Sequence, residues 1–288
     1  MSITTLLPPH VKDLGGGFLV RRLLPSPLRQ SVGPFLFFDH FGPLEHTPGV
    51  NTDVRPHPHI GLATVTYLWD GAMMHRDSLG YTQRIEPGAI NWMTAGRGIV
   101  HSERMPEDVR QMAHRRHGLQ LWAALPKDAE EADPAFVHTP ADAIPEVHAD
   151  GVTARVLIGE AFGKRSPVAT FSQTLYLDLA FSGGGSIILE PTVEERCVYS
   201  VDAPMAIDEV TVEPFHLAIL EPGRPIKVSA PNAARVVVLG GEPLDGRRRI
   251  WWNFVSSDPE RLELAKQRWK HQQMGTVPGE TEFIPLPE

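Results

Sequence analysis

Short runs of β-branched and aromatic residues, separated by turn residues, recur along the whole chain. They cover residues 18–24, 62–69, 81–85, 89–93, 119–125, 152–158, 174–180, 186–189, 197–201, 216–220, 226–229 and 235–239. The 25 glycines and 27 prolines are spread between these runs rather than gathered in one linker. Because short strands with turn residues between them are typical of β-sandwiches and barrels, the pattern predicts an all-β protein.

One long helix is predicted near the end of the chain, from residue 259 to about residue 272. Pro259 suits the first turn of a helix, and either Asp258 or Ser257 can cap it. The positions that would share one face of this helix are Leu262, Ala265, Lys266 and Trp269.

A weak internal repeat indicates two related barrels. Residues 64–71 align without gaps on residues 196–203, and a later IEPG segment resembles an LEPG segment at a similar spacing in the second half. We therefore predict two domains, residues 1–135 and residues 136–288, with the C-terminal helix belonging to the second.

Charge and composition exclude several classes of protein. The 27 basic residues against 35 acidic ones give a net charge of −8, so direct nucleic-acid binding is not expected. No stretch approaches the roughly 18 apolar residues that cross a bilayer, and residues 1–10 show no secretory signal. The single cysteine, Cys197, cannot form an internal disulfide. We expect a cytoplasmic protein without membrane contact.

Two segments, RPHPH and GRGIVHSE, carry the residues best suited to chemistry. Residues two apart on a strand point to the same face, so His57 would converge with His59, and His101 with Glu103. Three imidazoles and one carboxylate suit one divalent ion of intermediate softness. Fe²⁺ is the preferred ion, and Mn²⁺, Co²⁺, Ni²⁺ and Zn²⁺ are alternatives. Ordinary loop histidines are the competing interpretation, and two same-face pairs argue against it.

The second barrel lacks such a set. The repeat alignment places Leu189 opposite His57 and Pro191 opposite His59. Neither leucine nor proline can ligate a metal, so the second barrel is predicted to be structural.

Other residues could support the metal site. His75 could lie beside the ligands and orient one of them or a proton, or it could be a turn histidine bonded to Asp77. Gln120 and Trp122 share one face of a predicted strand and could line the mouth of the site, although a core role for the tryptophan is favoured.

At these residues the chain resembles the pirin family of bicupin proteins. The resemblance extends over nearly the whole chain and is carried above all by the long segment WMTAGRGIVHSE. The segments GPFLFFDHFGP, GLQLW and LGGEPL also match. The resemblance implies two antiparallel, jelly-roll-like cupin barrels packed together, the second of them degenerate. It also implies iron in the first barrel, with ligands His57, His59, His101 and Glu103.

The chain departs from the family pattern at Ala63, four residues after the second histidine of the HxH pair, where a glutamate is common. Because Glu103 fills the carboxylate role, metal binding should survive. A mechanism that needs a second carboxylate as base becomes doubtful.

The resemblance implies two possible functions. One is a quercetin 2,3-dioxygenase, which would take a flavonol-like aromatic substrate and O₂, with Glu103 or His75 as the catalytic proton acceptor. The other is an iron-dependent redox sensor or transcriptional cofactor that acts by binding a protein partner.

Overall fold

A computed structural model of the chain describes residues 2–15, 18–48 and 52–287. It separates into two compact units. Unit 1 consists of Met1–Lys12, Arg21–Asp39 and Asp142–Pro243, and unit 2 consists of Asp13–Val20, His40–Ala141 and Leu244–Glu288. The units are interleaved along the chain, which differs from the single division expected between residues 135 and 136.

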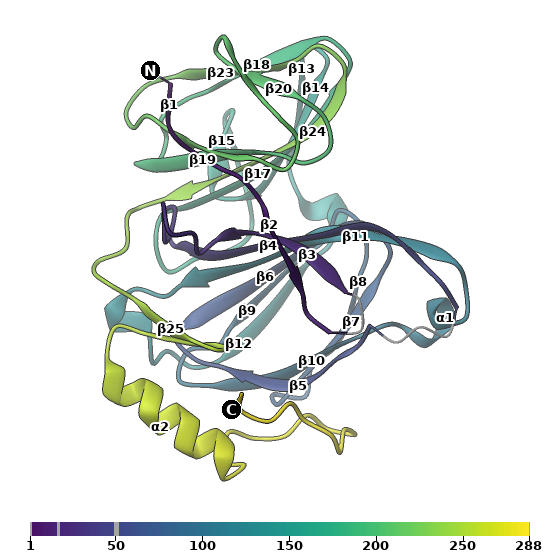
Figure 1. Cartoon of the computed structure of the whole chain (residues 1–288), viewed down its shortest axis with the longest axis vertical. Helices are drawn as coiled ribbons and strands as arrows, with labels where there is room; N and C mark the ends of the chain where they lie inside the picture. The colour runs from purple at the N-terminus through teal and green to yellow at the C-terminus, as the bar shows by residue number, and fades with distance from the viewer. Residues whose placement is uncertain (1, 16–17, 49–51, 288) are drawn as a thin grey trace. The chain divides into compact units, whose positions relative to one another are not determined.

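Antiparallel strands form most of the regular secondary structure (Figure 1). One seven-stranded sheet has the order β12-β9-β6-β11-β4-β3-β2, and a four-stranded sheet has the order β5-β10-β7-β8. Their strands are β2 (His10–Asp13), β3 (Leu19–Leu24), β4 (Phe35–His46), β5 (Val54–His59), β6 (Leu62–Asp70), β7 (Met73–Asp77), β8 (Thr82–Ile85), β9 (Ile90–Thr94), β10 (Ile99–Arg104), β11 (His114–Ala124) and β12 (Ala135–Thr139).

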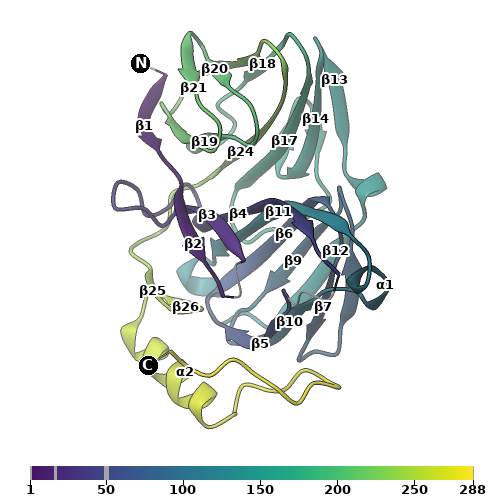
Figure 2. The ribbon, with the colours of Figure 1, turned by 45° about the vertical axis from the view of Figure 1, so that its right-hand side comes forward.

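A second pair of sheets builds unit 1 (Figure 2). A seven-stranded sheet has the order β1-β22-β19-β24-β17-β14-β13, and a four-stranded sheet has the order β18-β23-β20-β21. Their strands are β1 (Ile3–Leu7), β13 (Glu146–Ala149), β14 (Val152–Ile158), β17 (Thr174–Ser182), β18 (Gly185–Leu189), β19 (Glu195–Ser200), β20 (Met205–Ile207), β21 (Val210–Val212), β22 (Leu217–Leu220), β23 (Ile226–Ala230) and β24 (Ala233–Gly241).

The remaining elements are short, with one exception. They are the strand pairs β15 (Glu160–Ala161) with β16 (Lys164–Arg165) and β25 (Arg249–Trp251) with β26 (Phe254–Ser256), the helices α1 (Glu107–Arg110) and α2 (Pro259–Lys270), and the 3₁₀ turns η1 (Lys127–Ala129) and η2 (Ala141–Ala143). Helix α2 is the predicted long helix. The Asp258 side chain accepts a hydrogen bond from the Glu260 amide at its start, as the sequence predicted.

Helix α2 belongs to unit 2, although the sequence placed it with the second barrel. Its buried face, formed by Leu262, Ala265 and Trp269, packs in one hydrophobic cluster with Ile60 and Val100. Burial of this face against the strands that carry the histidine motifs explains the assignment.

Hydrocarbon side chains fill the interior of unit 1. On β24, Ala234, Val236 and Val238 alternate with residues of the other face and enter a single buried cluster. Leu189, which the repeat alignment placed opposite His57, is 3% exposed and belongs to the same cluster. The interior of this unit is therefore a packed core at the position where unit 2 carries its histidines.

Cys197 should react with a thiol reagent only after the protein unfolds. The side chain is fully buried on β19, and burial raises the pKa of its thiol to about 12. Since the thiolate is the reacting form, little of it exists near pH 8. Labelling with Ellman's reagent should give no signal within minutes in native buffer and one thiol per chain in guanidinium chloride. Rapid native labelling would contradict the burial of this thiol.

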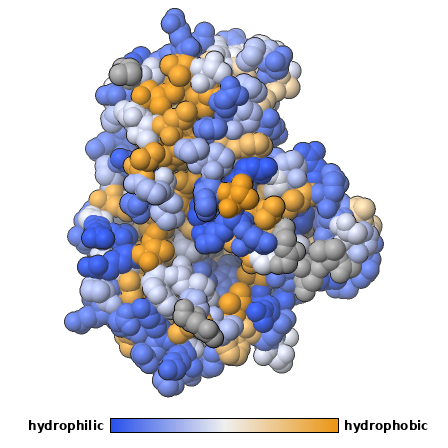
Figure 3. Space-filling view, in the orientation of Figure 1, coloured by the Kyte–Doolittle hydropathy of each residue, from blue (hydrophilic) through white to orange (hydrophobic). Residues whose placement is uncertain are grey.

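One face of the surface is mostly polar. On the face drawn in Figure 3, hydrophilic residues dominate and apolar residues form small groups between them. Among the described residues, no helix has the length and apolar character needed to cross a membrane.

Candidate metal centre

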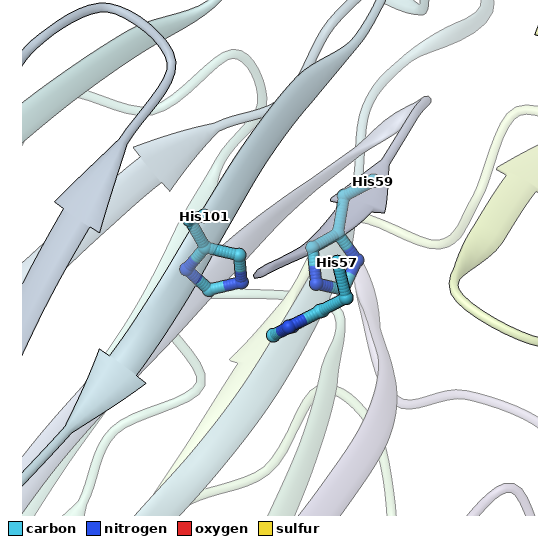
Figure 4. Close-up of side chains that lie close together, drawn as sticks. All are labelled: His57, His59 and His101. Atoms are coloured by element: carbon cyan, nitrogen blue, oxygen red, sulfur yellow. The ribbon is translucent and has the colours of Figure 1, made fainter. Parts of the chain in front are cut away.

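Three histidines of unit 2 converge on one point. His57 and His59 lie on β5, and His101 lies on the neighbouring strand β10. The two strands are antiparallel, with His101 directly opposite His57 and Ile99 opposite His59, so strand alternation turns all three rings to one side. One ligand atom from each ring lies within 4.8 Å of the others. Figure 4 shows the three rings facing one another.

Protein carbonyl groups fix the orientation of two of these rings. His57 Nδ1 donates to the carbonyl oxygen of Arg55 at 2.9 Å, and His59 Nδ1 donates to that of Asn253 at 3.1 Å. Because a carbonyl can only accept, Nδ1 carries the proton in both rings. The lone pair is therefore on Nε2, and this is the tautomer that can bind a metal through that atom.

A short hydrogen-bonded chain fixes the third ring. Asp77 Oδ2 lies 2.9 Å from His75 Nε2, and His75 Nδ1 lies 3.4 Å from His101 Nδ1. Since the carboxylate accepts from His75, the other nitrogen of His75 is left to accept from His101. The Nε2 atom of His101 then carries the lone pair, and it is buried with no hydrogen-bond partner within the described part of the chain. An unpartnered buried lone pair in such a cluster fits a metal ion.

His75 thus makes both contacts that the sequence left as alternatives. It bonds Asp77, the last residue of β7, and it also touches the predicted ligand His101. The ring stacks on Phe136 with the two centroids 4.1 Å apart. Because both ring nitrogens face protein groups, this arrangement favours an orienting role over that of a proton acceptor.

Burial keeps the three histidines neutral. It lowers the pKa of His57 to about 4 and holds the pKa of both His59 and His101 well below the ordinary value. Neighbouring imidazoles lower these pKa values further, because two adjacent rings cannot both be charged at low cost. A metal ion would therefore find unprotonated imidazoles at neutral pH.

Glu103, the fourth predicted ligand, lies two residues beyond His101 on β10. The register between β10 and β5 shifts at this point, so Glu103 lies opposite Val54 on one side and opposite His75 on the other. Its carboxylate is not in the group of converging ligand atoms, and among the described residues it has no hydrogen-bond or ion-pair partner. Burial raises the pKa of Glu103 to about 7, while the positive charge of Arg116 opposes the rise.

Trp122 forms one wall of the site. Its ring meets that of His59 edge-on, with centroids 5.2 Å apart, and the side chain is buried. The cross-strand partner of Trp122 is Thr64, which shares its face, whereas Ala63 pairs with Ala123 on the other face. On β6, Thr64 rather than Ala63 therefore shares a face with Trp122. Neither residue carries a carboxylate.

Gln120, the other predicted lining residue, lies two residues before Trp122 on β11. Its side-chain oxygen accepts a hydrogen bond from the Thr66 hydroxyl at 2.9 Å.

Two further residues act on the predicted ligands and were not predicted from the sequence: Asn253 contacts His59, and Arg116 acts on Glu103. Asn253 acts through its backbone carbonyl, which carries no sequence signal, and Arg116 lies in a segment without a motif.

Family models match both halves of the chain. A pirin model matches residues 17–123, and a model of the pirin C-terminal cupin domain matches residues 176–275. The chain belongs to the pirin family. Among pirin relatives, a pirin-like protein of Caulobacter vibrioides is 44% identical, with 96% of each chain covered. A putative quercetin 2,3-dioxygenase of Pseudomonas aeruginosa is 38% identical over 90% of this chain and 81% of its own.

A solved structure shares the whole pirin fold. The crystal structure of a quercetin 2,3-dioxygenase from Acinetobacter baumannii superposes with a TM-score of 0.91 at 33% identity, covering 99% of this chain and 95% of its own. The predicted fold class, two antiparallel cupin barrels with a C-terminal helix, is thereby confirmed.

Proposed function

We propose that this pirin-family chain is a mononuclear metal-dependent dioxygenase that opens flavonol-type substrates with O₂. The proposal is carried by the convergence of three neutral imidazoles, each with Nδ1 engaged by the protein and Nε2 left for a metal. His57, His59 and His101 would hold one divalent ion, preferably Fe²⁺, and Glu103 would supply the fourth ligand. A charged carboxylate offsets part of the charge that a divalent ion brings into a buried site.

The residues of the site suit this chemistry. A bound ion would lower the pKa of the hydroxyl group of a coordinated flavonol, as it lowers that of water. Glu103 would accept the hydroxyl proton. The His75–Asp77 pair holds the His101 ring in place, and Trp122 supplies an apolar wall that keeps water from one side of the site.

The names of the relatives support the substrate class. A relative at 38% identity and a solved structure at 33% identity are both described as quercetin 2,3-dioxygenases, the first of them as putative. Quercetin is therefore the substrate to test first.

Oxygen uptake tests the proposal directly. The metal-free chain is loaded with Fe²⁺ without oxygen and then mixed with air-saturated buffer, with and without quercetin. We expect quercetin-dependent O₂ consumption with carbon monoxide release, and no consumption by metal-free protein. Metal binding without consumption of O₂ or substrate would contradict the dioxygenase and favour the redox-sensor alternative.

Metal analysis should return at most one tightly bound ion per chain. The interior position of unit 1 that corresponds to the histidine pair is occupied by Leu189 within a hydrocarbon core, which offers a metal no ligand. Titration of metal-free protein with Co²⁺, monitored by absorbance, should reach its endpoint at or below one equivalent. Two tight equivalents would contradict this interpretation of unit 1.

His75→Ala should weaken metal affinity by about 10–100-fold without removing the site. The substitution takes away the acceptor for His101 Nδ1, so that the ring can rotate or change tautomer. A chelator-competition assay measures the affinity. His148→Ala, in which an exposed side chain of unit 1 is removed, is the control and should leave it unchanged. Equal affinities in the two variants would exclude an orienting role for His75.

A further inference from the structure

The last segment of the chain, residues 271–287, lies along the strands that carry the metal-site histidines. We call it the C-terminal strap. Figures 1 and 2 show it, in yellow, running beside β5 and β10 after helix α2. Its Met274 and Val277 side chains are buried in the same hydrophobic cluster as Ile60 and Val100, which adjoin His59 and His101 in the chain. The strap therefore packs against residues that adjoin the metal-site histidines in the chain.

The strap contacts β10 on the side that faces away from the metal centre. Because β10 pairs with β7 without a register shift from His101 to Arg104, strand alternation turns His101 and Glu103 to one face and Ser102 and Arg104 to the other. Glu280 of the strap contacts both outward side chains. The Ser102 hydroxyl donates to its carboxylate at 2.5 Å, and Arg104 donates through Nε at 3.1 Å and also through Nη2.

These contacts lie where the ladder between β5 and β10 is irregular. The register shifts between His101 and Glu103. On the β5 side, Pro56 and Pro58 have no N–H group to donate to a ladder. The carbonyl oxygen of Pro56 instead accepts from the Ile284 amide of the strap at 2.8 Å. The strap thus supplies hydrogen bonds to both strands close to the point where their pairing register shifts.

The central ion pair of this contact is shielded from water. The Glu280 side chain is 9% exposed and that of Arg104 is 13% exposed. Glu282 also pairs with Arg104, at 2.8 Å, but its side chain is 51% exposed. Burial raises the pKa of Glu280, but hydrogen bonds from Arg104 and Ser102 outweigh this effect and hold it below the ordinary value. The shielded carboxylate is therefore charged at neutral pH.

We propose that Glu280 is a positioning residue of the metal centre, which fixes His101 and Glu103 through the outward-facing Ser102 and Arg104. Two groups on the same strand bind one carboxylate, so the backbone between them cannot twist without breaking a charge-assisted bond. Twisting of β10 at this point would move His101 and Glu103, its two inward-facing residues, apart. The inference rests on the proposed metal site.

The test compares Glu280→Ala with Glu282→Gln, which alters the exposed partner of the same arginine. Co²⁺ affinity is measured by chelator competition and ligand geometry by the visible absorption spectrum of the Co²⁺ protein. We expect Glu280→Ala to weaken affinity by about 10–100-fold and to change the spectrum, as loss of an outer support does in metal sites. Glu282→Gln should stay within about 2-fold, since exposed ion pairs contribute little.

A second set of measurements separates positioning from stability. The thermal unfolding midpoint of each metal-free variant reports stability alone, and hydrogen exchange of peptides from β10 reports local twisting. If Glu280→Ala does not fold, Ser102→Ala is measured in its place. This substitution removes one of the two contacts to Glu280 and should weaken Co²⁺ affinity by about 2–10-fold. A lower midpoint with unchanged Co²⁺ affinity and spectrum would refute the positioning role. Absence of Co²⁺ binding by the wild-type protein would instead refute the metal centre itself, and the inference with it.

Discussion

His101→Ala should weaken divalent metal binding by more than about 100-fold, because loss of a ligand exceeds the 10–100-fold cost of losing an outer support. His101 is the only contribution of β10 to the three converging imidazoles, and it lies directly opposite His57. Without it, the ion would keep only the two rings of β5 and the proposed carboxylate ligand Glu103. Isothermal titration with Co²⁺ or Fe²⁺ under anaerobic conditions measures the loss.

The fold should survive this substitution. His101 is neutral in the metal-free protein, since burial holds its pKa well below the ordinary value, so no buried charge loses a partner. A metal stabilises the native state only through its own binding free energy, about 2.7 kcal/mol at a hundredfold excess over the dissociation constant. The wild-type unfolding midpoint should therefore rise with added metal, and the variant midpoint should not. A variant that still gains stability from metal would show that His101 is not a ligand.

The sequence predicted the convergence of histidines because strand alternation is a strong local rule. A single HxH spacing is sufficient to turn His57 and His59 to one face, and no long-range information is needed for this step. The antiparallel register that sets His101 directly opposite His57 is known from the structure and was not predicted. The partner of Glu103 on β5 did not follow from the same rule. A register shift next to it changes its neighbour on β5 to Val54, and such irregularities leave no trace in spacing.

The groups that hold the ligands could not be predicted for a different reason. Asn253 contributes a carbonyl oxygen, which every residue possesses, and it lies 194 positions from His59. The division of the chain into two interleaved units could not be predicted from the sequence either. Strand β1 joins the sheet of unit 1 through its pairing with β22, although the two are separated by most of the chain. Contacts between distant segments depend on the tertiary fold, and a local pattern of apolar residues does not encode their partners.

Glu103→Gln should abolish quercetin-dependent oxygen consumption even when metal is saturating. The amide keeps the shape of the side chain and one oxygen atom, so part of the metal affinity should remain. It lacks the negative charge, and it cannot accept a proton from the substrate hydroxyl. The carboxylate has no hydrogen-bond or ion-pair partner among the described residues, so the substitution breaks no structural contact of this kind. Activity is measured as O₂ uptake at several Fe²⁺ concentrations, up to the point where metal binding is complete.

Glu107→Gln is the matched control for this substitution. Glu107 is 86% exposed in α1, so the Glu107→Gln protein should turn over substrate at the wild-type rate. A general acid–base group contributes roughly 10²–10⁴-fold to a rate, so Glu103→Gln should lose at least about 100-fold. If Glu103→Gln instead matches the control at saturating Fe²⁺, the carboxylate takes no part in the reaction. The proton of the substrate would then need another acceptor, and His75, whose two ring nitrogens already face His101 and Asp77, is poorly placed to serve as one.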